Sequence, residues 1–412
     1  MAILQAKAAP VLSYINARLA LFYFSYLAVL GAFAPYFGPF LSARGFSDTQ
    51  VGLVMAVWYG TRIFAPSVWN ATVSKAKRPT LWLQGCALLV LVCAALFQPH
   101  WPMVGVVLVM LFFASAYNAI MPQFEAHTLR QLRQTPMLYG RVRLFGSLGF
   151  LLVVLGFGAL FRSIGVDYLI LATLPIVLLL LISTCVQGEL VSDQPAQAGI
   201  SQPGSQARFL GSFWARCTSL PSQAYGILLI ACLNQIAHGP FYVYFSIYLG
   251  RTDYSKLSIG AFWALGVLAE IFMFYLLSSR FAKKIRLLSS PEKLLALSMA
   301  IGALRWLAVA IAPESVALLA LSQCLHAFTF AAAHSCLVQL ITRQFPNQLG
   351  FAQGLFYGFS GGVGGMLGAG LAVLLWAQIS PSAAYYGAAI ISFAAFILCT
   401  RTFATQSSGA IR

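Results

Sequence analysis

"LYGRVRLFGSLGF", residues 138–150, opens an apolar run that continues to residue 162 and contains two arginines, Arg141 and Arg143. About 20 predominantly apolar residues let a helix cross the ~30 Å hydrocarbon layer of a membrane, and this run is long enough. A guanidinium inside that layer is costly, so it is expected to face a partner or a water-filled cavity. The stretch therefore predicts a membrane protein with a polar site inside it.

Eleven further runs of this kind occur along the chain of 412 residues, of which only 8% are charged. A soluble protein carries about a quarter charged residues. We therefore predict an all-α integral membrane protein with twelve transmembrane helices. The expected spans are 17–41, 48–70, 79–97, 102–126, 138–162, 166–186, 222–249, 257–279, 292–312, 314–342, 347–377 and 380–401. The polar leader before the first span lacks a small-residue cleavage signature, so we expect that span to be retained.

One segment interrupts the pattern, because residues 187–220 are rich in Ser, Gln, Pro and Gly. It divides the spans into six and six. This predicts an N-terminal six-helix bundle (1–190), a cytoplasmic central loop (191–220) and a C-terminal six-helix bundle (221–412). Two helical repeats of this kind are typical of secondary transporters, whose substrate site lies near the bilayer midplane between the repeats.

The net charge of +16 indicates membrane orientation rather than nucleic-acid binding. With the N-terminus inside, seventeen Lys and Arg residues fall in inner-side segments. The outer loops hold four, namely Arg44, Arg162, Arg251 and Lys256. This positive-inside bias predicts that both termini are cytoplasmic, and the basic segments would face anionic lipid. We expect a monomer embedded in the lipid bilayer of a bacterial-type inner membrane, with no nucleic-acid partner.

The eight cysteines have no paired spacing typical of a metal site, and most fall inside the expected spans. Buried reduced thiols are the simplest interpretation, so no metal or cofactor is expected. A membrane enzyme would need a nucleophile with a base, or a metal cluster, at membrane depth. The histidines of the tenth span, His326 and His334, have no acid on their own helix. We therefore do not expect an enzyme.

Two of the nine acidic residues, Glu125 and Glu270, fall inside apolar spans. Glu125 and Arg143 are eighteen positions apart across one hairpin, whose turn is near Gln134. On two antiparallel helices these side chains reach similar depth, so we predict that they meet. Arg141 lies nearer the end of its span and can extend to the interface.

The second half of the chain carries a comparable set. Glu270 and Arg305 flank the inner loop after the eighth span, each roughly 11–13 residues into its helix, or about 17–20 Å at 1.5 Å per residue. Arg305 and His326 flank the outer turn near Glu314. These side chains are therefore predicted to share one layer near the midplane. His334 follows two turns later on nearly the same face.

Such a layer can move protons or hold an anion. A carboxylate beside Arg and His in a low dielectric can exchange a proton as its neighbours move. An arginine not fully occupied by the protein can bind a carboxylate in a bidentate manner. Buried ion pairs that only fix helix register are the alternative. Aromatic residues of the first and seventh spans, including Tyr26 and Tyr244, could line a cavity for an aromatic substrate, although packing also explains them.

Several stretches together resemble the phenylpropionic acid permease family of the major facilitator superfamily. They are "FSYLAVLGAFAPYFGPFL" (24–41), "YGRVRLFGSLGF" (139–150), "LGVLAE" (265–270), "GALRW" (302–306) and "LHAFTFAAAH" (325–334). The resemblance covers nearly the whole chain apart from the central loop. It implies a major facilitator fold with two six-helix bundles, and it favours an aromatic carboxylate such as 3-phenylpropionate as the substrate.

The same residues are similar to the lactose/proton symporters of that superfamily. By this resemblance Glu125 and Arg143 match residues that hold the sugar. Glu270, Arg305 and His326 match residues of sugar binding and proton coupling. Two positions depart from the pattern. The symporters' proton-carrying glutamate, three positions after the histidine, is Thr329 here, and their lysine three positions before it is Gln323.

These inferences predict a transporter that takes up a small organic solute together with protons by alternating access. Arg143 or Arg305 would receive the substrate carboxylate, with Glu125 positioning Arg143, and Glu270 with His326 would gate or carry the proton. The predicted substrate-binding residues are Glu125, Arg143, Glu270, Tyr26 and Tyr244, and the predicted proton-coupling residues are Glu270, Arg305, His326 and His334.

Three alternatives remain open. A carboxylate near each arginine also fits a neutral, hydroxyl-rich ligand, so the protein could be a proton symporter for a sugar or nucleoside. Thr329 cannot carry a proton at neutral pH, which fits a uniporter. A transporter-like sensor that moves no solute would be expected to have an extra soluble domain or a long tail, and the sequence indicates neither.

Overall fold

The computed structural model describes residues 14–73, 76, 78–132, 138–187, 220–279, 282, 284–285, 287–345 and 354–409. Within these ranges every regular element is a helix, and twelve helical spans are long and apolar enough to cross a membrane. The predicted all-α membrane fold with twelve spans is confirmed. The central loop predicted at 191–220 falls outside the described residues except for its last position.

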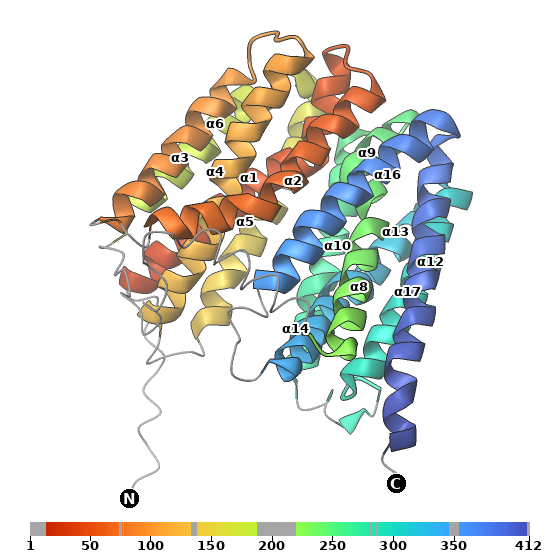
Figure 1. Cartoon of the computed structure of the whole chain (residues 1–412). Coiled ribbons are helices and arrows are strands. Elements are labelled where there is room, and N and C mark those ends of the chain that lie inside the picture. The colour runs from red at the N-terminus through yellow and green to blue at the C-terminus, as the bar shows by residue number, and fades with distance from the viewer. Residues whose placement is uncertain are drawn as a thin grey trace, which may run out of the picture.

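The first six spans form one bundle, drawn from red to yellow in Figure 1. Aromatic side chains fill its centre: the Phe33 ring stacks on Phe113 with centroids 4.5 Å apart, and Tyr26 stacks on Tyr117 at 4.2 Å. Within the bundle α1 packs on α5 and α6, while α4 packs on α2 and α3. Its helices are α1 (Tyr14–Ala43), α2 (Asp48–Val73), α3 (Pro79–Leu96), α4 (Met103–Gln131), α5 (Leu138–Ile164), the 3-10 turn η1 (Val166–Tyr168) and α6 (Leu169–Cys185).

The last six spans form the second bundle, drawn from green to blue. Here several spans are composed of more than one helical segment. In order, the segments are α8 (Ser222–Ala237), α9 (Gly239–Arg251), α10 (Lys256–Ser278), α12 (Pro291–Ile311), α13 (Val316–His326), the π-helical turn η2 (Ala327–Ala332), α14 (Ala333–Gln344), the π-helical turn η3 (Gly358–Gly364), α16 (Gly365–Gln378) and α17 (Pro381–Gly409).

One of these interruptions has a local cause in the sequence. Pro240 follows the junction between α8 and α9, and proline has no N–H to continue the hydrogen-bond ladder, so the seventh span breaks at His238. The turns η2 and η3 interrupt the tenth and eleventh spans. Such π-helical turns insert a residue into a helix and occur frequently at functional sites.

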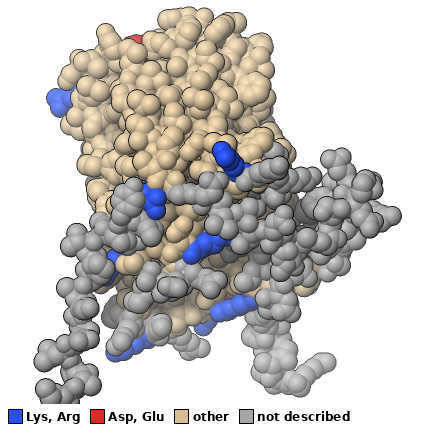
Figure 2. All heavy atoms as spheres, turned by 90° about the vertical axis from the view of Figure 1, so that its left-hand side faces the viewer, with Lys and Arg blue, Asp and Glu red and all other residues tan. Residues whose placement is uncertain are grey.

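The two bundles lie side by side, and both the start of α1 and the end of α17 lie at the lower end of the molecule in Figure 1. Figure 2 shows Lys and Arg side chains mainly on the lower part of the N-terminal bundle's outer face. We use "lower end" for the side at which α1 begins and "upper end" for the opposite side.

The bundles approach each other closely where α5 crosses α10 in the upper half. A Cβ atom added to Gly158 would lie 2.9 Å from the backbone oxygen of Lys256, and one added to Gly260 would lie 2.6 Å from that of Val154. Only glycine leaves room for backbones this close. The crossing therefore holds the upper halves together and leaves space between the bundles below.

Candidate functional site

A cavity of about 1320 Å³ lies between the two bundles. Side chains of α1, α2 and α5 line it from one side, and those of α8, α9, α10, α13, η2 and α14 line it from the other. It extends down to Arg141 near the lower end of α5 and to Ser278 at the lower end of α10. Its place between the bundles and its mainly apolar and aromatic lining are typical of a binding site for a small molecule.

At the upper end, a cluster of contacts joins the bundles, and we call it the upper clasp. Asp48, at the start of α2, accepts hydrogen bonds through Oδ2 from Arg251 Nη2 at 2.6 Å and from Trp376 Nε1 at 2.7 Å. The Tyr244 hydroxyl donates to the Asp48 backbone oxygen at 2.8 Å. One carboxylate thus links α2 of the first bundle to α9 and α16 of the second. The cavity is closed above and reaches the lower end.

Glu125 and Arg143 meet, as their spacing predicted. Arg143 Nη1 lies 2.6 Å from Glu125 Oε1, and it also donates to the Tyr139 hydroxyl at 2.7 Å. Tyr139 in turn donates to the same carboxylate. Arg143 lines the cavity near its lower mouth, and its side chain is 53% exposed. A charged pair at an open mouth can exchange its partners for a ligand's hydroxyl or carboxylate groups.

Glu270 and His326 form the corresponding pair in the second bundle. His326 Nε2 lies 2.7 Å from Glu270 Oε1, and both side chains line the cavity although both are mostly buried. The layer predicted for these residues is therefore present. An acid that faces a cavity and touches an imidazole can give up or take a proton as its surroundings change.

Arg305 belongs to the same layer but lies behind the cavity wall. It is fully buried, with the Trp306 ring 4.0 Å and the Phe241 ring 4.8 Å from its guanidinium carbon. Its Nε donates to the Ser322 backbone oxygen at 2.9 Å, and its Nη1 donates to the Thr329 hydroxyl at 2.9 Å. In the described parts of the chain no carboxylate lies within ion-pair distance of it. The expected role of Arg305 as a receptor for the substrate carboxylate does not fit this placement.

Two features of this layer escaped the sequence reasoning. His238, which sits at the break before Pro240, is buried and contacts Arg305 Nη1 through Nε2 at 3.4 Å. The helix break positions this imidazole, and the His-Gly-Pro sequence was the signal that could have indicated it. In addition, Arg305 Nη2, Gln323 Oε1 and His326 Nδ1 are buried and have no hydrogen-bond partner among the residues that the structure describes. Buried groups of this kind are rare and call for an explanation.

His334 also lines the cavity, about two turns below His326. Its ring stacks on Phe330 with centroids 6.3 Å apart and lies 6.1 Å from the Tyr357 ring. The extra residue of η2 brings His326, Phe330 and His334 to one face of the tenth span. The sequence reasoning placed both histidines on nearly the same face, and the structure agrees.

Tyr26 and Tyr244 do not line the cavity, in contrast to the expectation that they would. The Tyr26 ring is buried against Tyr117, and its hydroxyl donates to the Tyr117 backbone oxygen at 3.1 Å. Tyr244 stacks on Trp376 with centroids 4.2 Å apart and takes part in the upper clasp. Aromatic density alone could not separate these packed rings from others on the same helices that do face the cavity, such as Phe33 and Tyr242.

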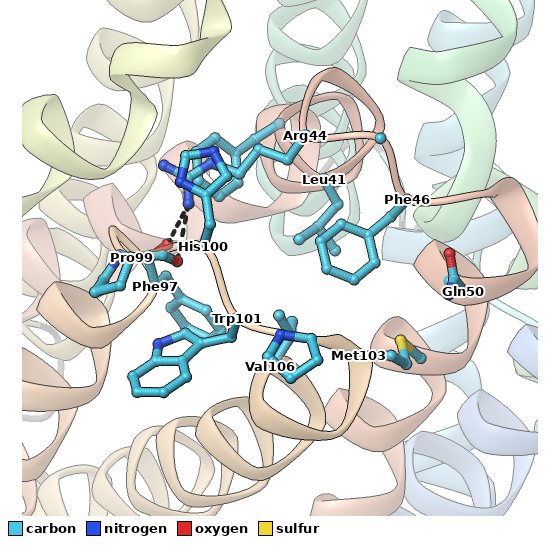
Figure 3. A pocket seen from close by; sticks show the side chains of 13 residues that line it. Leu41, Arg44, Phe46, Gln50, Phe97, Pro99, His100, Trp101, Met103 and Val106 are labelled. Atoms are coloured by element: carbon cyan, nitrogen blue, oxygen red, sulfur yellow. Dashed lines mark hydrogen bonds between the residues drawn. The ribbon is translucent and has the colours of Figure 1, made fainter.

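A smaller hollow of about 250 Å³ lies at the upper end, between the connections that follow α1 and α3. Figure 3 shows the Arg44 side chain extending toward His100 and the backbone beyond α3. Arg44 Nη1 donates to the backbone oxygens of Phe97 at 3.0 Å and Pro99 at 3.1 Å, and its guanidinium lies 4.4 Å from the Phe40 ring. Partial burial lowers the pKa of Arg44, and nearby Asp167 opposes this shift. These contacts tie two loops together, so we assign the hollow a structural role.

Comparisons with known proteins agree with this architecture. The family described as "MFS_1 like family" matches residues 16–387. The probable 3-phenylpropionic acid transporter of Escherichia coli (strain K12) is 28% identical over 323 residues, which is 78% of this chain and 81% of that protein. The maltose permease of Geobacillus stearothermophilus is 29% identical over 143 residues, which is 34% of this chain and 35% of that protein.

Among solved structures, a point mutant of the nucleoside transporter NupG superposes with a TM-score of 0.80. It shares 14% sequence identity and covers 94% of this chain and 100% of its own. This similarity shows a shared fold only. Together with twelve membrane-spanning helices and a central cavity, the match along nearly the whole chain identifies the protein: it belongs to the MFS_1 like family, and it is a multi-pass membrane transporter of the major facilitator superfamily for a small-molecule substrate.

Proposed function

We propose that this protein takes up a small organic solute together with protons, as a monomer in a bacterial inner membrane. The substrate class that we propose is an aromatic carboxylate such as 3-phenylpropionate. The observation that carries the proton coupling is the contact between Glu270 and His326 on the cavity wall. The substrate class is supported by the relative from Escherichia coli and by the aromatic lining of the cavity.

The proposed orientation places the lower end in the cytoplasm. Basic side chains are concentrated there, and cytoplasmic segments of membrane proteins carry an excess of Lys and Arg. Both termini are then cytoplasmic. The cavity, which reaches the lower end and is closed by the upper clasp, is then in the inward-facing state of the alternating-access cycle.

In this proposal the residues in and behind the cavity wall have separate roles in proton exchange and substrate binding. Glu270 exchanges the proton with the cavity, and His326 accepts or returns it as the pair opens and closes. Glu125 and Arg143 contact the substrate near the cytoplasmic mouth, with Tyr139 holding both in place. Arg305 supplies a fixed positive charge behind the wall, and His334 adds a second titratable ring to the path between cavity and cytoplasm.

A second candidate is transport of a neutral, hydroxyl-rich solute, such as a sugar or nucleoside, with or without protons. The Glu125–Arg143 pair favours it, because a carboxylate and a guanidinium held together can accept and donate hydrogen bonds to hydroxyl groups without attracting an anion. The local similarity to a maltose permease points in the same direction. Thr329 stands where lactose/proton symporters have a glutamate, and this favours transport of the neutral solute without protons.

Proton flux in proteoliposomes distinguishes these candidates. Purified protein is reconstituted with weak buffer and a pH-sensitive dye, and 3-phenylpropionate, lactose and a nucleoside are added in turn. We expect alkalinisation of the outer medium with 3-phenylpropionate alone. The same signal with lactose or the nucleoside would support proton symport but contradict the aromatic carboxylate as the substrate class. Equilibration of labelled solute with no proton movement would show uniport and contradict the coupling.

A further inference from the structure

Arg62 stands apart from the other cations of the cavity. It lies on the cavity wall, half-buried, fourteen residues after the start of α2 at Asp48. Glu270 lies fourteen residues after the start of α10 at Lys256, and both helices begin at the upper end. At 1.5 Å per residue each side chain is about 21 Å from that end. Arg62 and Glu270 therefore face the cavity from opposite bundles at similar depth.

The contacts of Arg62 fix its position but leave its charge uncompensated. Its Nε lies 3.4 Å from Asn118 Oδ1, and its guanidinium carbon lies 5.0 Å from the centre of the Tyr59 ring. Asn118 is held in turn by its Nδ2, which donates to Thr61 Oγ1 at 2.9 Å and to the Trp58 backbone oxygen at 3.2 Å. No carboxylate of the described residues is within ion-pair distance of Arg62, and its two Nη groups have no hydrogen-bond partner among those residues.

The other charged groups near the cavity are already engaged or lie elsewhere. Arg143 is paired with Glu125, and Glu270 touches His326. Arg305 is fully buried behind aromatic rings. Arg141 lies at the lower mouth, where its side chain is exposed. In the described part of the chain, Arg62 is thus the cation at mid-depth in the cavity with an unmatched charge, and a half-buried guanidinium of this kind favours an anion.

Apolar rings surround the space next to Arg62. Met55, Trp58, Tyr59 and Arg62 all line the cavity at helical spacing on α2, so Trp58 lies one turn, about 6 Å, above Arg62 on the same face. Phe33 of α1 stacks near Trp58, with centroids 6.1 Å apart. The Tyr59 ring lies 6.0 Å from the Tyr242 ring of the opposite bundle. A cation beside an aromatic pocket matches a ligand with a ring and a carboxylate separated by a short chain.

We propose that Arg62 binds the carboxylate of the transported aromatic acid, and that the rings of Trp58, Tyr59 and Tyr242 contact its aromatic end. This proposal rests on the proposed function, because it assumes that the substrate is an aromatic acid. It replaces Arg143 and Arg305 as the receptor of the carboxylate. Asn118 acts as a positioning residue, since it holds Arg62 through Nε and leaves both Nη groups turned to the ligand.

Ligand binding to the purified full-length protein tests the proposal. Labelled 3-phenylpropionate is titrated onto the wild type and onto Arg62→Gln, Arg62→Lys and Arg162→Gln, with the neutral amide 3-phenylpropionamide as competitor. Arg162→Gln removes an equal charge at the exposed upper end of α5, away from the cavity. We expect the wild type and Arg162→Gln to prefer the acid over the amide. Arg62→Gln should lose roughly tenfold or more in acid affinity and should lose that preference, and Arg62→Lys should retain part of both.

The outcomes separate this inference from the function on which it rests. If Arg62→Gln keeps the wild-type affinity and the wild-type preference for the acid, the role of Arg62 is wrong while the substrate class stands. If the wild type binds acid and amide equally, or binds neither but binds lactose or a nucleoside, both the role and the aromatic-acid class are overturned. The wild-type comparison of acid with amide decides this even if Arg62→Gln does not fold, and Arg62→Lys then reports on the site itself.

Discussion

Thr329 and Arg305 show how one exchanged side chain changes a buried polar layer. The Thr329 hydroxyl accepts from Arg305 Nη1 at the position where lactose/proton symporters carry a glutamate. A hydroxyl satisfies the hydrogen bond but does not cancel the charge. The rings of Trp306 and Phe241 stabilise this charge instead, because the quadrupole of an aromatic ring attracts a cation over its face. In the proposed mechanism the proton is carried by Glu270, which contacts His326 in the adjacent wall.

The first residue-scale prediction concerns this hydroxyl. Thr329→Val keeps the shape but removes the acceptor of a buried charged donor, so we expect a loss of about 1–3 kcal/mol in stability, seen as a lower melting temperature in detergent. Thr173→Val is the matched control. Thr173 is equally buried, but its hydroxyl only bonds the Leu169 backbone oxygen within its own helix. Equal melting temperatures for the two variants would contradict the importance of the Arg305–Thr329 bond.

The second residue-scale prediction concerns proton coupling. Glu270→Gln keeps the size of the side chain and a hydrogen bond to His326 but cannot release a proton. We expect this variant to lose accumulation of substrate against a gradient while it still exchanges labelled for unlabelled substrate across the membrane. Both are measured in proteoliposomes. Glu292→Gln is the control, because Glu292 pairs with Arg343 outside the cavity. Uphill accumulation by Glu270→Gln at the wild-type level would exclude Glu270 as the proton carrier.

At the scale of elements, hydropathy predicted all twelve spans because each must be apolar over the same membrane thickness. The depth of Glu125 and Arg143 followed from counting along one hairpin. The layer of Glu270 and His326 followed from counting across the inner loop and the outer turn on either side of Arg305. The rotation of each helix was harder. Tyr26 shows this, since it was expected in the cavity and its ring instead packs against Tyr117. Which face turns inward depends on packing between helices that are distant in sequence.

Breaks inside spans were also beyond the sequence reasoning. The π-helical turn η2 within "LHAFTFAAAH" depends on packing around it, and no residue in that stretch forces it. The break at His238, by contrast, has a local cause in Pro240. Because the sequence analysis did not include this break, it could not anticipate the contact of His238 with Arg305.

The crossing of α5 and α10 leads to the element-scale prediction. A methyl group at Gly260 would lie 2.6 Å from the Val154 backbone oxygen, so the helices would have to move apart. We expect Gly260→Ala to weaken the closed upper half and to slow transport. Gly156→Ala is the control, since Gly156 lies on the partner helix α5 and a Cβ there meets nothing within 4 Å. Transport rates in proteoliposomes measure both variants, and an unaffected Gly260→Ala would show that this crossing tolerates separation.

At the scale of the whole molecule, the cavity and the upper clasp correspond to the inward-facing state of the proposed alternating-access cycle. The cavity is reached from the lower end, and contacts between the bundles lie above it. For the opposite state to form, these upper contacts must break as the bundles rock. Asp48 is the centre of the clasp, since it takes hydrogen bonds from three side chains of the other bundle: Arg251, Trp376 and Tyr244.

The final prediction follows from this position. Asp48→Asn removes the charge that holds Arg251 and weakens the bond from Trp376, while the backbone oxygen used by Tyr244 remains. A loss of about 1 kcal/mol from the state closed above shifts the balance of the two states about fivefold. We expect spin labels at the upper ends of the two bundles, on Arg162 and Ile379, to show a larger population at long distance. Double electron–electron resonance measures this distribution.

Asp167→Asn supplies the control, because Asp167 is an exposed acid at the same end of the N-terminal bundle and takes no part in the clasp. If both variants give the wild-type distance distribution, Asp48 does not hold the upper end closed. If Asp48→Asn alone lengthens the distances, added 3-phenylpropionate should redistribute them again. A ligand shifts such an equilibrium only by as much as its affinities for the two states differ. The size of that shift therefore measures how differently the two states bind the substrate.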